Sequence, residues 1–138
     1  MQRQQAQATV ELALVTLVLA VLVVGLVSAS EIVQAQMGLK AVAEEAALAA
    51  ALAPSADTVE QRGQERGLAV GDGYALRNGS LGIVIQYAQF GPGQPVRAMA
   101  TYRLTSRDIP VLFAGPVDLS LSAVEIVPRF RGLPSAAQ

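Results

Sequence analysis

A long uncharged stretch near the N-terminus constrains this chain more than any other feature. From Leu12 to Ser30 the sequence contains no charged residue and is rich in Leu, Val and Ala, and Glu11 and Glu31 stand at its two borders. A helix needs about 20 consecutive, mostly apolar residues to cross a bilayer. The sequence therefore predicts one membrane-spanning helix.

A cleaved secretory signal is the alternative interpretation of this stretch. Val27 and Ala29 would suit a small-residue cleavage site, and Arg3 would supply the positive charge at the start of such a signal. Two features favour the membrane helix. The stretch exceeds the about 7–15 apolar residues of a usual signal, and Glu11 would place a carboxylate at its entrance.

The helical pattern continues beyond the apolar stretch. Residues 32–53 contain no proline, have Gly38 as their one breaker and are dense in Ala, Leu and Val. Proline disfavours helical geometry in the residue before it, so the helix is expected to end before Pro54. Polar residues indicate that this second half lies in water. They are Glu31, Gln34, Gln36, Lys40, Glu44 and Glu45.

Alanines in this second half would give a smooth surface that another element can approach closely. They are Ala41, Ala43, Ala46, Ala47, Ala49, Ala50, Ala51 and Ala53. Two roles remain open for them. The alanines line the core of the chain's own domain, or they form an interface with another subunit.

After Pro54 the sequence predicts a short polar helix. Ser55 or Asp57 can cap this helix, which is expected to run through about Gly67. Residues 71–73, with the sequence Gly-Asp-Gly, then indicate a loop.

Three strands are expected in the rest of the chain. The first covers residues 81–90, and the second covers 96–104, where apolar residues alternate with mostly polar ones. Turn-forming residues at 91–95 predict an antiparallel hairpin between them. The third strand covers 117–127, and its apolar residues fall on both faces, which predicts a bulge or burial on both sides. Leu119, Leu121 and Ala123 share one face, while Val124 and Ile126 lie on the other.

These elements predict an α+β fold. It consists of a long N-terminal helix that spans the membrane in its first half, a short second helix, and a small three-stranded antiparallel sheet packed on the helix's outer half. The expected organisation is a leader at 1–6, a transmembrane and assembly helix at 7–30, its extramembrane continuation at 31–53, a small extracytoplasmic domain at 54–132 and a flexible tail at 133–138.

Composition narrows the function classes. The chain has no cysteine and no histidine, which removes the thiol nucleophile, the commonest general base and the commonest metal ligand. Its ten basic residues are scattered and its net charge is -1, so the sequence has no basic patch for nucleic acid. We therefore expect a protein that is not an enzyme and has no catalytic residue, cofactor, metal or nucleic-acid partner.

Weaker candidate sites are expected to be structural. Glu44 and Glu45 are adjacent on a helix and point about 100° apart, which favours a solvated face over a metal site. The Gly-Asp-Gly sequence at 71–73 lacks the further carboxylates of a calcium loop. The apolar segment 109–113 is expected to cover the domain's own core, with a contact to another subunit as the alternative.

The first residues carry the motif with the most chemical content. A small residue, Ala6, precedes the polar Gln7, and one carboxylate, Glu11, follows at the mouth of the apolar stretch. Residues 7–14 have the pattern Gln-x-x-Val-Glu-x-Ala-Leu. This N-terminus resembles that of type IV pilin-like precursors, in particular the TadE-like proteins of tight-adherence (Flp) pilus systems.

The resemblance implies specific roles for these residues. In that family a membrane aspartyl prepilin peptidase cuts after the small residue, which implies processing between Ala6 and Gln7. Glu11 would become the fifth residue of the mature chain and would pair with the new amine of a neighbouring subunit, which sets the axial register. The implied partners are the peptidase, the membrane, and other pilin subunits or copies of the same chain. A major subunit of the Flp type is usually much shorter, so the resemblance favours a minor pilin or pseudopilin.

The position of Glu11 also predicts that its carboxylate needs a partner or water, and this prediction does not depend on the family. A carboxylate at the edge of a membrane helix costs on the order of 1–3 kcal/mol if it is unpaired, so it reaches the interface or finds a partner. The alternative to the pilin role is therefore an interfacial glutamate without a partner.

Two functions follow as hypotheses. The first is a non-catalytic, pilin-like subunit that takes part in assembling a type IV/Tad-type pilus for surface attachment. The second is a single-pass, membrane-anchored accessory or binding protein that is never polymerised. We expect the chain in the inner (cytoplasmic) membrane with its C-terminal domain outside the cytoplasm, and the pilin route would carry it to the cell surface.

Overall fold

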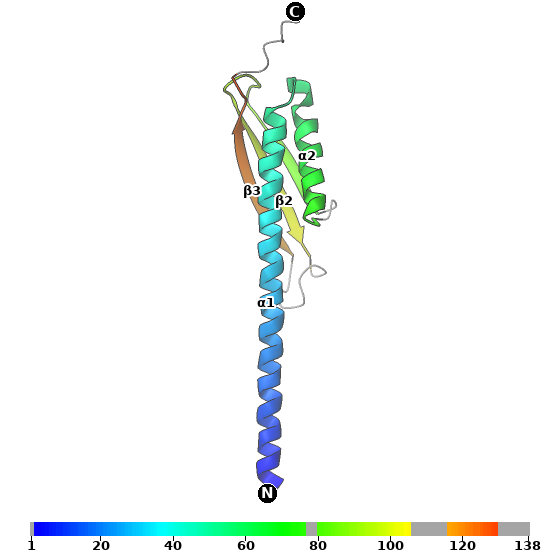
Figure 1. Ribbon diagram of the computed structural model, residues 1–138, viewed down its shortest axis with the longest axis vertical. Helices are drawn as coiled ribbons and strands as arrows, with labels where there is room; N and C mark the ends of the chain where they lie inside the picture. The colour runs from blue at the N-terminus through cyan, green and yellow to red at the C-terminus, as the bar shows by residue number, and fades with distance from the viewer. Residues whose placement is uncertain (1, 77–79, 106–115, 130–138) are drawn as a thin grey trace, which may run out of the picture.

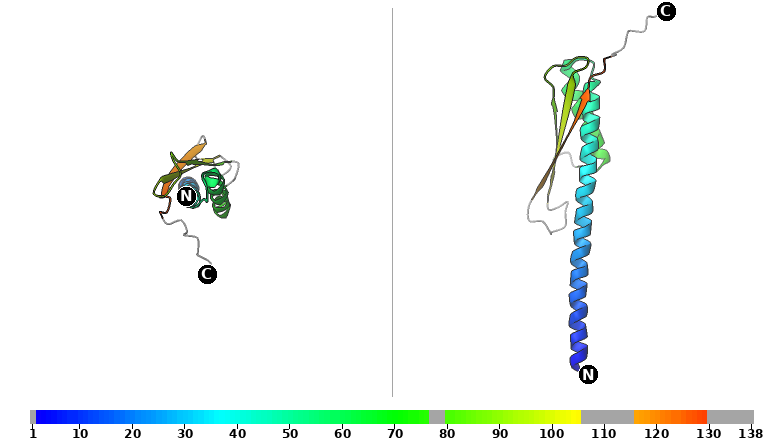
Figure 2. Two further views of the ribbon diagram at one scale, coloured as in Figure 1. Left: turned by 90° about the horizontal axis from the view of Figure 1, so that it is seen from above. Right: turned by 90° about the vertical axis from the view of Figure 1, so that its left-hand side faces the viewer.

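The computed structural model describes residues 2–76, 80–105 and 116–129, and side chains from Gln7 onward. Its elements, in chain order, are α1 (Gln2–Ala51), the 3-10 turn η1 (Ala56–Thr58), α2 (Val59–Gly73), β1 (Leu81–Gln86), β2 (Pro95–Leu104) and β3 (Val117–Ile126). The first half of α1 projects as a bare rod, and α2 and the sheet pack along its second half (Figures 1 and 2). The predicted α+β fold and the arrangement of its elements are confirmed.

α1 is one continuous helix that ends before Pro54, as predicted. The N–H groups of Leu52 and Ala53 extend its last turn by donating to the carbonyls of Leu48 and Ala50, at 3.0 and 3.1 Å. Six of the alanines noted in the sequence are buried in the domain's own core, which confirms the first of their two possible roles. They are Ala43, Ala46, Ala47, Ala50, Ala51 and Ala53.

α2 is longer than predicted. It continues through Gly73, so the loop predicted at 71–73 is wrong. Gly63, Gly67 and Gly71 recur every four residues on its buried face, and their lack of side chains lets α2 approach α1 and β1 closely. The β1 side chains that fill this space are Ile85, Ile83 and Leu81, at 2.7, 2.6 and 2.5 Å from Cβ atoms built on the three glycines in that order. This packing offsets the low helix propensity of glycine.

The N-cap residues of η1 and α2, Ser55 and Thr58, make no side-chain capping hydrogen bond. The hydroxyl of Thr58 instead donates to the carbonyl oxygen of Ser55 at 3.0 Å.

The three strands form one antiparallel sheet in the order β1-β2-β3. The predicted alternation of β2 is confirmed, because its even-numbered residues from Val96 to Leu104 are buried while Arg97, Thr101 and Arg103 are exposed. β1 ends at Gln86, earlier than predicted. A turn joins it to β2, and Gln94 N–H donates to Gly91 O at 3.0 Å. Gly93 has a φ of 79°, which suits the third position of a type II turn after Pro92.

β3 is a regular edge strand. Its register with β2 runs without interruption from Val117, opposite Leu104, to Ile126, opposite Pro95. Val124 and Ile126 point to the exposed face. The predicted bulge or two-sided burial is therefore wrong, because α1 covers one face of the strand and no described element covers the other.

The core lies between the second half of α1, α2 and the inner face of the sheet, in two adjoining clusters. Leu39 and Val42 pack with Tyr102 and Leu104 in the cluster nearer the bare rod. The second cluster, at the far end, joins alanines of α1 to Val59, Ile85, Val96 and Val127. The end of β2 and the start of β3 therefore lie near the rod, and Ile126 lies at the far end of the domain (Figure 1). Segment 109–113 and the tail at 133–138 lie outside the described residues.

Candidate functional site

The bare half of α1 is the first candidate site. It is long and apolar enough to cross a bilayer, and only 6% of its most apolar window is buried against the rest of the protein. Exposed Leu and Val side chains cover it on all sides, from Val10 to Val27. A core helix of a soluble domain would bury one face, so this surface is suited to lipid or to other apolar helices.

Hydroxyl groups within this apolar segment bond to the helix itself. Thr16 Oγ1 donates to the carbonyl oxygen of Leu12 at 2.8 Å. Ser28 Oγ donates to the carbonyl oxygen of Val24, also at 2.8 Å. Such bonds satisfy a polar group without a partner from water, as a lipid environment requires.

The residues of the N-terminal motif lie at the free end of α1, the end of the molecule away from the sheet (Figure 1). Ala6 and Gln7 are consecutive residues of α1. Glu11 lies four residues after Gln7, on the same face of the helix. Its side chain is exposed and makes no hydrogen bond or ion pair with any described residue. The structure thus brings Gln7 and Glu11 within one turn of each other.

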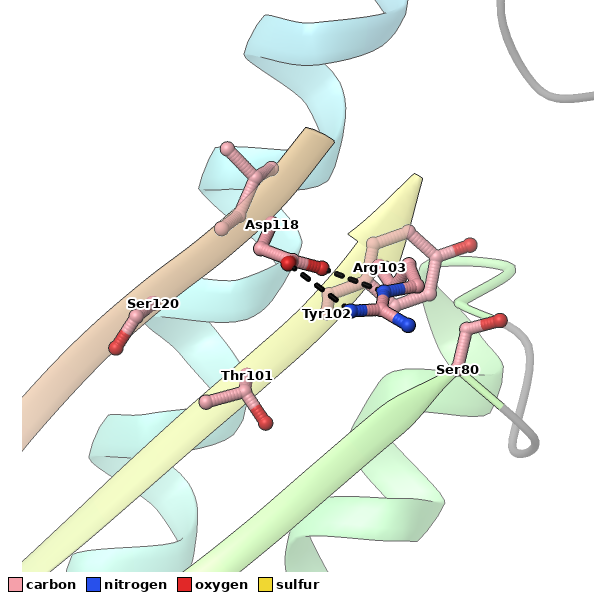
Figure 3. Close-up of a pocket in the computed structure, with 7 residues that line it drawn as sticks. Ser80, Thr101, Tyr102, Arg103, Asp118 and Ser120 are labelled. Atoms are coloured by element: carbon pink, nitrogen blue, oxygen red, sulfur yellow. Dashed lines mark hydrogen bonds and ion pairs between the residues drawn. The ribbon is translucent and has the colours of Figure 1, made fainter. Parts of the chain in front are cut away.

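The sheet carries a second candidate site that sequence reasoning missed. Arg103 Nε and Nη2 donate to the two carboxylate oxygens of Asp118 at 2.7 and 3.1 Å, from adjacent strands. This hydrogen bonding, with the nearby guanidinium charge, lowers the pKa of Asp118 below its ordinary value, and the same contact raises the pKa of Arg103. The pair borders an open hollow of about 500 Å³ (Figure 3). Its other lining residues are Ser80, Thr101, Tyr102, Leu119 and Ser120.

Arg103 and Asp118 neutralise each other's charge and hydrogen-bond to each other. Each carboxylate oxygen accepts from the guanidinium, so Asp118 is held ionised and is a poor general acid or base near neutral pH. Arg103 lies on the wet face predicted for its strand. Finding its partner required the β2–β3 register, which places Asp118 directly opposite.

The weaker candidate sites, Glu44, Glu45 and residues 71–73, do not form a common site. Glu44 pairs with Lys40 at 3.7 Å, whereas Glu45 pairs with Arg66 of α2 at 2.9 Å, so the two carboxylates diverge as expected. Asp72 lies inside α2. No group of three acidic residues among the described part of the chain is placed to hold a metal ion.

Comparisons of the chain with protein-family models, with curated proteins and with solved structures found no match.

Proposed function

We propose that this chain is a non-catalytic, pilin-like subunit, of the minor pilin or pseudopilin type, that takes part in assembling a type IV/Tad-type pilus for surface attachment. In this proposal a prepilin peptidase cuts between Ala6 and Gln7. The chain starts in the inner membrane with its C-terminal domain outside the cytoplasm, and moves to the pilus on assembly.

One observation carries the proposal. Glu11 lies at the mouth of an exposed apolar helix and has no partner within the described chain. A carboxylate in that place is stabilised by a cation, and cleavage before Gln7 would create one on each neighbouring copy. The described residues bury only 6% of the most apolar window of the helix that follows, so this surface can exchange lipid for the helices of other subunits.

The spacing of Gln7 and Glu11 along the helix determines the axial offset between subunits that the proposed pairing of Glu11 with a neighbour's N-terminal amine needs. Glu11 is four residues from Gln7, and an α-helix rises 1.5 Å per residue. For the carboxylate of one subunit to meet the amine of the next, two parallel helices must be offset by about 6 Å along their axes. A regular offset of this kind is what a filament requires.

The N-terminus of the protein purified from its own membranes provides the test. Intact mass measurement and N-terminal sequencing are expected to show a chain that starts at Gln7. An intact Met1 in cells with functional pili would exclude prepilin processing and would favour a permanently anchored accessory protein. A start near Ser30 would indicate a secretory signal.

The same measurement on Ala6→Arg tests the cleavage position. A bulky charged residue replaces the small side chain before the cut, so the uncut precursor is expected to accumulate. Arg3→Ala, within the same leader, serves as the matched control and is expected to be processed normally.

A further inference from the structure

The folded domain begins where the apolar stretch of α1 ends. Residues 12–30 are about 28 Å long at 1.5 Å per residue, close to the thickness of about 30 Å of the hydrocarbon core of a bilayer. Ile32, two residues further on, already packs against the core cluster nearer the bare rod, and Ala35 is buried in that cluster. α1 runs through both parts without a break. The near end of the domain, nearer the bare rod, therefore begins within about 3 Å of the end of the apolar stretch.

This near end has an exposed apolar surface next to α2. Val33, Met37 and Tyr74, which we call the near-end patch, are 48%, 64% and 53% exposed. Val33 lies one helical turn before Met37 on the same face of α1, and Leu26 of the bare rod lies two turns before Val33 on that face. Met37 and Tyr74 line one hollow of about 420 Å³, together with Gln34, Gly73 and Ala75. The apolar surface of the bare rod thus continues onto the domain.

Tyr74 is held against α1 at the end of α2. It is the C-cap residue of α2. Its Cβ and Cγ lie 2.9 and 3.1 Å from a Cβ built on Gly38, so the glycine lets the tyrosine lie close along α1. Its phenol makes no hydrogen bond with any described residue. An exposed aromatic ring with a free hydroxyl group is typical of the layer between lipid and water.

Heights along α1 place the patch at the headgroups. The headgroup regions add about 5–8 Å to each side of the hydrocarbon core. Val33 lies about 4 Å and Met37 about 10 Å beyond Ser30, and helical side chains point back toward the N-terminus, so Met37 covers the turn before it and reaches this layer. A tilt of α1 toward α2 by about 20°, the average for membrane helices, lowers Tyr74 by about 3 Å, because packed helices lie about 8–10 Å apart. Tyr74 then lies at the outer border of the headgroup layer.

Charged residues around the patch favour neutral headgroups. Among the described residues they are Glu31, Lys40 and Asp72. Lys40 pairs with Glu44 at 3.7 Å, so no free cation in this part of the chain attracts anionic lipid. The contact that the patch can make with a membrane is therefore apolar and does not depend on lipid charge.

We propose that the near-end patch lies on the headgroup layer of the membrane that α1 spans, so that the domain leans on the bilayer next to α2. Val33 and Met37 bury their apolar side chains there, and the phenol of Tyr74 bonds to headgroups or their water. Figure 2 shows α2 and the sheet at different positions around α1, so this lean turns the sheet away from the bilayer. The proposal rests on the membrane placement of α1 in the proposed function, and not on processing at Ala6 or on pilus assembly.

Single tryptophans test the contact, because the natural chain has no tryptophan. Full-length Met37→Trp, Leu22→Trp and Leu52→Trp, at similarly exposed positions of α1, are reconstituted in phosphatidylcholine vesicles. One set of vesicles contains lipid with a nitroxide on its headgroup, and the other contains lipid with bromine near the ends of its acyl chains. The nitroxide is expected to quench Met37→Trp severalfold more than Leu52→Trp, and bromine is expected to quench Leu22→Trp most.

Three outcomes would overturn the proposal, and they separate its failure from that of the membrane placement. Nitroxide quenching of Met37→Trp no stronger than that of Leu52→Trp, with Leu22→Trp quenched by bromine, would exclude the contact alone. Protection of Met37→Trp from both the nitroxide and aqueous acrylamide would show that protein covers the patch. A Leu22→Trp that bromine does not quench would exclude the membrane placement and the contact together.

Gln36→Trp is the matched control for the side of α1 that faces lipid. Gln36 is exposed and lies one residue nearer the membrane than Met37, about 100° around the helix from it. Height alone would give stronger nitroxide quenching at Gln36, whereas the proposed lean gives stronger quenching at Met37. Equal or stronger quenching of Gln36→Trp would overturn the lean.

Tyr74→Trp extends the test to the end of α2. The nitroxide is expected to quench it more than Leu52→Trp, and adding Met37→Asp is expected to lower this quenching, because a carboxylate enters the membrane interface less readily than a thioether. Leu48→Asp, at an exposed position of the same helix further from the membrane, is the control and should leave the quenching unchanged. Quenching of Tyr74→Trp that Met37→Asp does not change would contradict the shared contact. All of these positions are exposed, so the variants are expected to fold, and equal protease resistance in vesicles checks this.

Discussion

Gly63 of α2 and Ile85 of β1 are so close that a Cβ built on the glycine would lie 2.7 Å from Ile85 Cδ1 and 2.9 Å from Ile85 Cγ1. The carbonyl oxygen of Ala46 in α1 closes the same space at 3.2 Å. A backbone atom cannot rotate aside as the end of a side chain can. The spacing of α1, α2 and the sheet therefore depends on a glycine at this position.

Gly63→Ala is expected to destabilise the domain by up to about 2 kcal/mol. Overpacking costs about 1–3 kcal/mol, and the better helix propensity of alanine returns up to about 1 kcal/mol. Calorimetry of the full chain in detergent micelles measures the change. Gly73→Ala is the control, because nothing lies within 4 Å of its Cβ position in the same helix. Adding Ile85→Val, which removes Cδ1, should recover part of the loss.

The correctly predicted elements are those with a clear hydrophobic pattern in the sequence. Residues 96–104 alternate between buried and solvent-exposed positions. The stretch from Leu12 to Ser30 contains no charged residue. The same helical periodicity places Gln7 and Glu11 on one face without any knowledge of the tertiary structure. The fold class and the N-terminal motif could therefore be located from the sequence alone.

Where prediction failed, long-range contacts override local preference. The Gly-Asp-Gly sequence at 71–73 favours a turn locally, but Gly71 belongs to a row of glycines against which β1 packs. The four-residue spacing of Gly63, Gly67 and Gly71 was the signal for a helix face. The pair of Arg103 and Asp118 needed a strand register, which the mixed pattern of β3 does not specify.

The exposed pair of Arg103 and Asp118 predicts a small pH dependence of stability. The folded-state pKa of Asp118 is lowered, chiefly by the hydrogen bonds from Arg103, so the pair stabilises the domain fully above the unfolded pKa, about 3.9. This contribution is lost as the pH falls through the folded-state value. Asp118→Asn is expected to remove that part of the acid-induced decrease in unfolding temperature. Raised salt should weaken the effect in the natural chain, and a decrease that is identical in the variant would contradict this assignment.

Membrane insertion of α1 can be tested by placing charges in its apolar half. Leu19→Arg combined with Leu22→Arg is expected to raise the apparent free energy of insertion by about 5–7 kcal/mol, from about 2.5–3.5 kcal/mol for each arginine near the helix centre. Alkaline extraction of membranes should then release most of the variant and leave the natural chain in the pellet. Met37→Arg combined with Leu48→Arg is the matched control, since both side chains are exposed on the same helix beyond the apolar stretch. Release of both variants alike would mean that the apolar half has no special part in anchoring.

Removal of the Glu11 carboxylate tests the assembly role proposed for the N-terminal motif. If the chain is the pilin-like subunit proposed above, Glu11→Ala is expected to reduce surface pili by at least about tenfold, because a proposed pairing of about 1–3 kcal/mol would be lost at every subunit contact. Expression and alkaline-resistant membrane insertion should stay normal, since the substitution makes the helix more apolar. Pili sheared from the cell surface and quantified by immunoblot measure the loss. Glu31→Ala, at the other border of the apolar stretch, is the matched control and should assemble normally, because its carboxylate lies far from the proposed cleavage position. Normal piliation of Glu11→Ala would show that its charge is not needed for register and would leave an interfacial glutamate on a permanent membrane anchor as the better interpretation.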